Sequence, residues 1–304
     1  MNKEKAVMNR SASMARVALG VGLVGVTLVA GCDEPKNRCK VAPGLGVAKY
    51  TRNGNPAGNC TGVLLPVKGE AVGMQAFVPD PTKSTAPDEP TSFAIKPQWL
   101  GERIAEARDR AGLANYPYDS AGAPDVKDLT TTKRPYAYGV FGIVFPGDDG
   151  VCPAASVNAS DLMYPTIPAH MAPDPSDDTK MVMVAETPAS SIKYEWANLK
   201  TIQIPSSPGT QTFADLTVTR DGCTATYKAA ILVPKVGCGK ESNGQTVADP
   251  TACDPNPNAT NNFGSGISQG VPTECQDISR DPANPDQNDP ANPDFECVPT
   301  KTAP

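Results

Sequence analysis

The stretch FADLTVTRDGCTATYKAAILV, residues 213–233, decides the fold class of this chain. Asp221-Gly222 is a favoured two-residue hairpin turn, and apolar and polar residues alternate on both sides of it. Pairing the two arms about this turn gives one largely apolar face, which joins Arg220 with Cys223, Val218 with Ala225, Leu216 with Tyr227 and Ala214 with Ala229. The other face joins Thr219 with Thr224, Thr217 with Thr226 and Asp215 with Lys228. Turn type, register and face chemistry together predict an antiparallel hairpin.

Further segments with the patterning of short strands lie at 41–50, 63–66, 72–78, 136–145, 181–184 and 192–204. Leu199 breaks the alternation of the last segment, which predicts a β-bulge near Ala197 or Asn198. One amphipathic helix is predicted over 97–111, with Pro97 at its first position. Residues 79–91 and 165–179 are rich in turn formers and predict loops. We therefore expect a mainly β fold, with an antiparallel β-sandwich-like body, one amphipathic helix and a disulfide-pinned irregular C-terminal tail.

The N-terminus has the order of a secretory signal peptide. Basic residues in 1–16 precede an uncharged apolar run from Val17 to Val29, and a pair of small residues follows. As a helix this run spans about 20 Å, which is short of the roughly 30 Å of a bilayer core. Val29-Ala30-Gly31-Cys32 resembles the lipobox of bacterial lipoproteins. The resemblance implies cleavage between Gly31 and Cys32 and a covalent lipid on Cys32, with acyl chains such as palmitate that anchor the protein to a membrane.

Asp33 and Glu34, which follow the lipobox, imply retention in the inner membrane if the rule of enteric-type bacteria applies. The chain behind the lipobox is loosely similar to uncharacterised envelope lipoproteins of myxobacterial type, for which an outer-membrane location is common. We therefore expect a cell-envelope protein that is lipid-anchored to a membrane outside the cytoplasm, with inner and outer membrane both open.

Four segments are predicted from these features and from composition. They are a lipoprotein signal peptide at 1–31, a lipid-anchored tether at 32–37, a β-rich globular domain at 38–236 and a disulfide-containing tail rich in Asn, Asp and Pro at 237–304. The tail contains few apolar residues, so we expect disulfides to hold it to the β body.

The mature chain is acidic. The signal peptide carries four basic residues and one acidic residue, so its removal changes the net charge from −6 to −6 − 3 = −9. This charge argues against nucleic acid as a partner and against attraction to anionic lipid. An envelope protein or a glycan is the partner class that remains open besides the membrane itself.

Eight cysteines remain when Cys32 is set aside, and their even number in an exported chain predicts four disulfides. They are Cys39, Cys60, Cys152, Cys223, Cys238, Cys253, Cys275 and Cys297. A strand from Cys223 to Val233 moves the chain about 33 Å, so Cys223 cannot pair with Cys238. We predict a Cys152–Cys223 bridge, because both cysteines follow turns, a local Cys39–Cys60 bridge, and pairing of the last four among themselves.

No residue set has the pattern of a catalytic or metal site. Gly266 to Gly270 matches GxSxG around Ser268, but a nucleophile elbow needs a strand before it and a helix after it. The single histidine, His170, lies upstream in a Pro-rich segment and is expected to be exposed. The Asp/Asn run 281–294 offers oxygen ligands, yet prolines interrupt it and no glycine shapes it for calcium. Asp148 and Asp149 are explained by a turn, so we predict no catalytic residue, no metal and no cofactor.

The sequence therefore predicts a lipid-anchored lipoprotein that acts as a non-catalytic binding or structural module of unknown specific activity. The alternative is a lipid-anchored extracytoplasmic hydrolase whose carboxylates no motif reveals. A concave pocket with two facing carboxylates would favour the alternative.

Overall fold

Residues Lys36–Pro304 form one compact unit of the chain. The computed structural model describes residues 37–301, except for residues 64, 67, 80–88, 103–135, 165, 167, 175, 187, 206, 259–263, 280–288 and 290. The description below concerns this unit.

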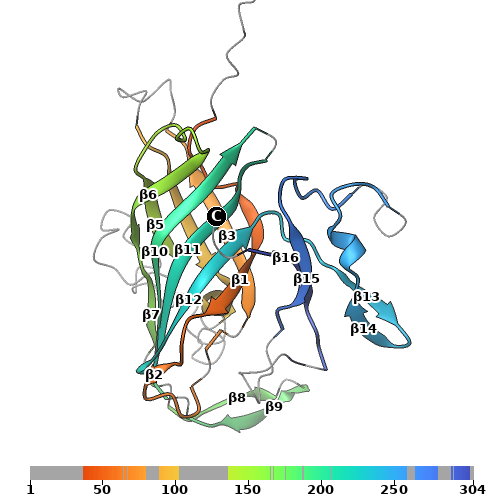
Figure 1. Ribbon diagram of the computed structural model, residues 1–304. Helices are drawn as coiled ribbons and strands as arrows, with labels where there is room; N and C mark the ends of the chain where they lie inside the picture. Colours follow the sequence, from red (N-terminus) through yellow and green to blue (C-terminus); the bar gives the residue numbers. More distant parts are fainter. Residues whose placement is uncertain are drawn as a thin grey trace, which may run out of the picture. The chain divides into compact units, whose positions relative to one another are not determined.

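One large antiparallel sheet forms the body (Figure 1). Its main strands are β1 (Gly44–Arg52), β3 (Gly69–Phe77), β4 (Ser92–Pro97), β5 (Ala137–Phe141), β6 (Val151–Asn158), β10 (Ser190–Ile204), β11 (Ser207–Arg220) and β12 (Cys223–Leu232), each paired with the next. Because β12 also pairs with β1, the sheet closes on itself. The short strand β2 (Ala57–Gly58) pairs with the start of β12, and β7 (Ser160–Tyr164) pairs with the start of β10. The predicted mainly β, antiparallel fold class is confirmed, and the sandwich-like arrangement arises from a single closed sheet.

The β11–β12 hairpin has the predicted register at every pair from Ala214↔Ala229 to Arg220↔Cys223. Asp221 and Gly222 adopt φ values of 47° and 83°, as a two-residue hairpin turn of this type requires. The Thr219 and Thr224 hydroxyls lie 3.0 Å apart, and the Lys228 ammonium pairs with the Asp215 carboxylate on the outer face.

Apolar side chains fill the interior of the closed sheet. Tyr194 and Tyr227 are the largest of those that are fully buried, and the Phe93 and Phe141 rings pack with centroids 4.9 Å apart. The predicted bulge in β10 is confirmed, because the pairing with β11 shifts between Ala197 and Lys200. The bulge turns the buried Leu199 onto the same inner face as Tyr194.

Several local predictions were wrong. Residues 63, 65 and 66 form no strand, whereas β2, β4, β6 and β7 had no counterpart in the predicted strands. Within the segment predicted as a loop at 165–179, strand β8 (His170–Asp174) pairs with β9 (Asp177–Val184). Pro97 ends β4, and helical residues begin at Gln98 and continue through Glu102. The remainder of the predicted helix lies outside the described residues.

The C-terminal segment is more regular than predicted. It contains hairpins β13 (Gly239–Ser242) with β14 (Gln245–Ala248) and β15 (Thr273–Asp277) with β16 (Phe295–Pro299), and the 3-10 helix η1 (Pro250–Cys253). A second hydrophobic cluster joins this tail to the outer face of β1 and β12 through Val47 and Leu232. The tail residues in that buried cluster are Cys238, Cys253, Ile267, Val271, Ile278, Cys297 and Val298.

The four disulfides are Cys39–Cys152, Cys60–Cys223, Cys238–Cys275 and Cys253–Cys297. Pairing of the last four cysteines among themselves is confirmed, as is the exclusion of Cys223–Cys238. The predicted Cys152–Cys223 and Cys39–Cys60 bridges are wrong. The tail disulfides link the tail to itself, so the expectation that they hold it to the β body is also wrong; apolar and polar contacts join the two.

The physical reason for the wrong pairings is the length of two strands. Cys152 is opposite Thr201 near the end of β10, whereas the turn before Cys223 bonds to Ser191 at the start of β10. Ten strand residues, about 33 Å, separate these positions. The full length of β1 likewise separates Cys39 from Cys60. Cys152 and Cys223 both follow turns, but the two turns are at opposite ends of the sheet.

Candidate functional site

A polar cavity of about 210 Å³ lies where the start of β3, the helical residues 98–102 and the tail meet. Its polar lining residues are Lys68, Glu70, Gln98, Glu102, Ser279 and Asp294. Three of these side chains carry carboxylates, the groups from which the alternative hydrolase interpretation would draw its acid and base. No sequence motif marks these residues, because they come from three separate segments.

Glu70 is held by a set of hydrogen bonds on β3. The Tyr50 and Tyr194 hydroxyls donate to its Oε1 at 3.0 and 2.9 Å, and the Trp99 backbone N–H donates to its Oε2 at 2.9 Å. Tyr50 and Tyr194 come from β1 and β10, so the carboxylate connects distant parts of the closed sheet. The three hydrogen bonds fix the position of the carboxylate, because each comes from a group that the sheet or the adjoining helical residues hold in place. This arrangement favours a structural role for Glu70.

The chemistry of Tyr50 agrees with that role. Burial, reinforced by the neighbouring Glu70 carboxylate, raises the pKa of the Tyr50 hydroxyl well above its ordinary value. Tyr50 therefore stays protonated at physiological pH and donates its hydrogen bond to Glu70. Trp99, whose backbone N–H donates to Glu70, also has the Arg220 guanidinium 4.9 Å from the centre of its ring.

The two other carboxylates at this cavity also have side-chain partners, and Glu102 accepts a hydrogen bond of 2.6 Å from the Gln98 side-chain amide. Asp294 lies 3.5 Å from the Lys235 ammonium. The cavity thus combines one carboxylate that accepts three hydrogen bonds with two others that each pair with a neighbouring side chain.

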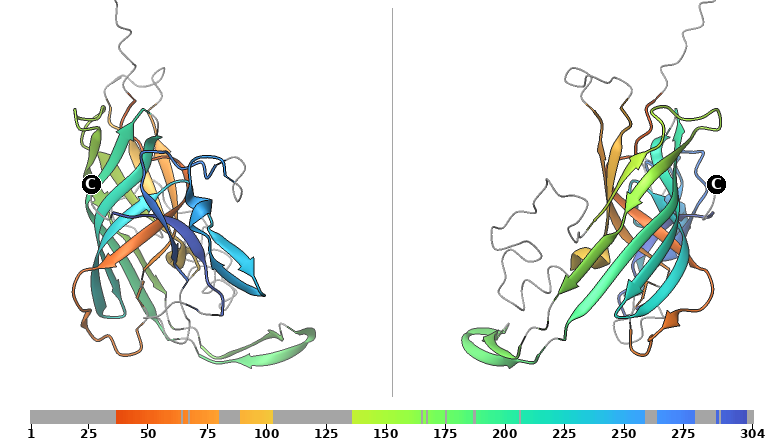
Figure 2. Two further views of the ribbon diagram at one scale, coloured as in Figure 1. Left: turned by 45° about the vertical axis from the view of Figure 1, so that its right-hand side comes forward. Right: turned by 90° about the vertical axis from the view of Figure 1, so that its left-hand side faces the viewer.

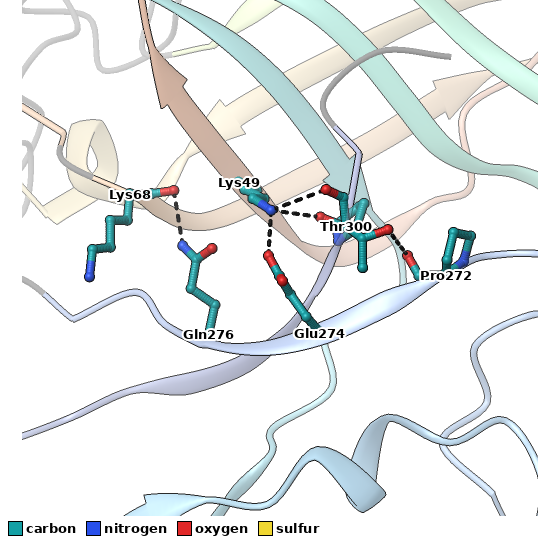
Figure 3. Close-up of polar contacts among 7 residues, drawn as sticks. Lys49, Lys68, Pro272, Glu274, Gln276 and Thr300 are labelled. Atoms are coloured by element: carbon teal, nitrogen blue, oxygen red, sulfur yellow. Dashed lines mark hydrogen bonds and ion pairs between the residues drawn. The ribbon is translucent and has the colours of Figure 1, made fainter.

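Polar contacts join β1 to the tail beside this cavity (Figure 3). The Lys49 ammonium on β1 pairs with Glu274 of β15 and donates to the carbonyls of Pro299 and Thr300. The Gln276 amide donates to the Lys68 carbonyl at 3.4 Å. These contacts, together with the second hydrophobic cluster, fix the tail against the outer face of the sheet.

A partly buried ion pair follows β12. Glu296 is buried on β16, and Lys235 lies 2.9 Å from one of its carboxylate oxygens. Burial raises the pKa of Glu296, while its carboxylate raises the pKa of Lys235 against the opposing effect of burial. The pair connects the end of the β body to the last tail strand.

The residues of the GxSxG match do not form a nucleophile elbow. Ser268 lies in a turn closed by a bond from the Val271 N–H to the Ser268 carbonyl, and no strand precedes it among the described residues from 264 onward. His170 is the first residue of β8 and not part of a loop, which corrects its predicted setting. The sequence did not reveal the β8–β9 hairpin because Pro173 interrupts its apolar alternation.

The candidate metal ligands are explained by local structure where the structure describes them. Asp149 closes a turn by accepting from the Val151 N–H, as predicted. Asp289 accepts from the Ala291 N–H and the Asn292 side chain, and these bonds lower its pKa. Most of the remaining 281–294 run lies outside the described residues. The sulfur atoms of Cys238, Cys253 and Cys297 lie within 4.8 Å of one another, but all three are disulfide-bonded and supply no thiolate ligand.

The predicted lipidation site, Cys32, and the predicted cleavage residue, Gly31, lie outside the described residues. In the part of the chain that the structure describes, no helix has the length and hydropathy of a membrane-spanning segment.

The β8–β9 hairpin carries an unusual surface. Met171 is paired with Met183, and Met181 with Pro173, so the three methionines share one face of the ribbon. Met171 is 50% exposed, Met181 is 54% exposed and Met183 is 67% exposed. Methionine is more often buried, and exposed methionines are over-used at binding surfaces because the side chain adapts to its partner. Sequence patterning missed this face because β8 was predicted as a loop.

A family model described as MlpA matches residues 44–234. The chain belongs to the MlpA family. The match covers the closed sheet from the first residue of β1 to just beyond β12, and the tail lies outside it. Membership of MlpA supports an envelope-associated lipoprotein and specifies no catalytic or binding activity. No curated protein and no solved structure shows significant similarity to the chain.

Proposed function

We propose that this MlpA-family chain is a lipid-anchored lipoprotein of the cell envelope that acts as a non-catalytic binding or structural module. The observation that carries the proposal is that the interior of the closed sheet is filled and that Glu70 is hydrogen-bonded within the fold. Large side chains occupy the interior, and the Glu70 carboxylate accepts hydrogen bonds from two tyrosine hydroxyls and a backbone N–H. A carboxylate that the fold holds in this way supports a structural role, whereas a general acid or base must lie within reach of its substrate.

The face of Met171, Met181 and Met183 is the surface that best fits a partner in this proposal. It projects on a two-stranded ribbon beyond the closed sheet (Figure 2). An apolar, adaptable surface suits an envelope protein better than a glycan, since sugar sites generally combine aromatic platforms with hydrogen-bonding groups.

The anchor in this proposal is tested by Cys32→Ser. The variant lacks the thiol that accepts the lipid, so we expect it to move from the detergent phase to the aqueous phase on phase partitioning. Intact mass should show no lipid on the variant, and Gly31 should be absent from the wild-type mature chain. Asp33→Asn is the matched control, because it changes the neighbouring residue and should remain in the detergent phase. A Cys32→Ser protein that stays membrane-bound with an unchanged mature mass would contradict the anchor.

The second candidate function, a lipid-anchored hydrolase, is favoured by one observation, the cavity that Glu70, Glu102 and Asp294 line. If this cavity were catalytic, Glu102 would be its better acid or base, because Glu70 is held by three donors. We expect no turnover by the wild-type mature protein on ester, peptide or glycan panels. Turnover that Glu102→Gln abolishes, and that Glu195→Gln on the outer face of β10 leaves intact, would support the hydrolase and overturn the non-catalytic module.

A further inference from the structure

Four exposed apolar side chains lie on two connections at one end of the closed sheet. Phe77 and Val78, at the end of β3, are both 49% exposed. Ile143 and Phe145, between β5 and β6, are 36% and 44% exposed. The ends of β3 and β5 adjoin through β4, because Ser92 pairs with Phe77 on one side and with Val140 on the other. Figure 2 shows these strand ends at the same end of the sheet.

The first described residues of the chain are fixed at this same end. The Cys39 N–H donates to the Val144 carbonyl at 2.8 Å, between the two exposed residues of the β5–β6 connection. The Arg38 guanidinium donates to the Glu89 carbonyl at 2.7 Å, just before β4. The Cys39–Cys152 disulfide then locks the segment to the start of β6. The point from which the chain leads back to Cys32 is therefore held between the exposed apolar residues.

We propose that this apolar end, defined by Phe77, Val78, Ile143 and Phe145, rests on the membrane that holds the lipid of Cys32. This inference rests on the proposed lipid anchor. Five residue steps separate Cys32 from Asn37, and even a fully extended chain covers only about 18 Å in that number of steps. A lipid on Cys32 thus keeps this end of the body within a short distance of the bilayer surface. A protein partner bound at this end would have to fit between the body and the bilayer, within the roughly 18 Å that the chain from Cys32 to Asn37 can span.

The contact is apolar in character. Arg38 and Lys40 lie near this end, but so do Asp148 and Asp149 of the β5–β6 turn, and the mature chain is acidic as a whole. Charge attraction to anionic lipid therefore supplies little. Aromatic and aliphatic side chains that insert into the interface between headgroups and acyl chains supply the contact instead.

The β8–β9 hairpin leads into the start of β10, whereas Cys152 is paired near the end of β10. The hairpin, and with it the methionine face, is consequently at the end of the sheet away from the apolar end; Figure 1 shows β8 and β9 beyond the lower ends of the main strands. With the apolar end on the membrane, the hairpin points away from the bilayer. This orientation provides an internal control for the experiment.

The test uses the full-length lipidated protein in phosphatidylcholine vesicles that contain brominated acyl chains. Phe145→Trp places a fluorescent probe at the apolar end, and Met183→Trp places one on the hairpin. The native Trp99 and Trp196 are buried, so they contribute a constant background to aqueous quenching. We expect at least twofold stronger quenching of Phe145→Trp than of Met183→Trp by the brominated lipid. Iodide in the aqueous phase should give the opposite order.

The intact mass of each reconstituted protein separates the two possible failures. A chain without lipid mass would overturn the anchor and the docking together. A lipidated chain in which iodide reaches Phe145→Trp as readily as Met183→Trp would overturn the docking and leave the anchor standing.

Discussion

The double substitution Cys60→Ser and Cys223→Ser is expected to lower the free energy of unfolding by about 5 kcal/mol. The two cysteines are 163 residues apart in the sequence, and the chain-entropy relation gives about this value for a closed loop of that size. The disulfide also holds β2 against the first residues of β12, where Gly58 pairs with Cys223. Urea unfolding of the oxidised mature protein measures the effect.

The tail disulfide offers a matched control for this experiment. Cys253 and Cys297 are 44 residues apart, and the same chain-entropy relation gives a smaller effect for this shorter loop. Replacing both with serine should therefore lower the free energy of unfolding by about 1 kcal/mol less than the Cys60→Ser, Cys223→Ser substitution does. Peptide mapping of the unreduced wild-type protein should give Cys39–Cys152 and Cys60–Cys223 peptides. A Cys152–Cys223 peptide would contradict the pairing. A decrease of less than about 1 kcal/mol in the free energy of unfolding of the Cys60→Ser, Cys223→Ser variant would contradict the expected contribution of the Cys60–Cys223 disulfide.

Glu70→Leu is expected to destabilise the protein by about 4 kcal/mol. The substitution removes the acceptor of the Tyr50 and Tyr194 hydroxyls and of the Trp99 N–H, and each buried donor that loses its acceptor costs about 1–3 kcal/mol. Glu70→Gln keeps a carbonyl acceptor in nearly the same place and should cost less. Equilibrium unfolding in urea measures both variants.

Two further variants separate hydrogen bonding from other effects at this position. Adding Tyr50→Phe and Tyr194→Phe to Glu70→Leu removes the two hydroxyls that lost their acceptor, so part of the lost stability should return. Glu195→Leu is the control on β10, because the Glu195 carboxylate makes a surface pair with Lys193, and losing such a pair should cost less than about 1 kcal/mol. A triple variant no more stable than Glu70→Leu would show that the hydrogen bonds to the tyrosines are not what the carboxylate provides.

Local sequence patterns determined those parts of the fold in which neighbouring residues carry the information. The Asp221-Gly222 turn set the register of β11 and β12, since the turn geometry and the alternation of faces act within one hairpin. The break in apolar alternation at Leu199 located the β10 bulge, because alternation is likewise a property of neighbouring residues. The β8–β9 hairpin escaped prediction because its prolines and aspartates resemble a loop, and backbone pairing stabilises the ribbon despite them.

The candidate site depended on contacts that no local pattern contains. Glu70 is an ordinary residue of an alternating strand until closure of the sheet brings Tyr194, 124 positions away, against it. The tail similarly became ordered through packing on Val47 and Leu232 and through two disulfides within itself.

The sequence by itself determined the mainly β class, the hairpin register and the set of eight paired cysteines, because periodicity, turn chemistry and cysteine number are local or compositional properties. Only the tertiary structure decided which cysteines pair, where Glu70 finds its donors and which end of the sheet carries the apolar side chains. Those outcomes depend on how long strands such as β1 and β10 separate or join distant residues when the sheet closes, and strand order and closure are set by the packing of the whole chain.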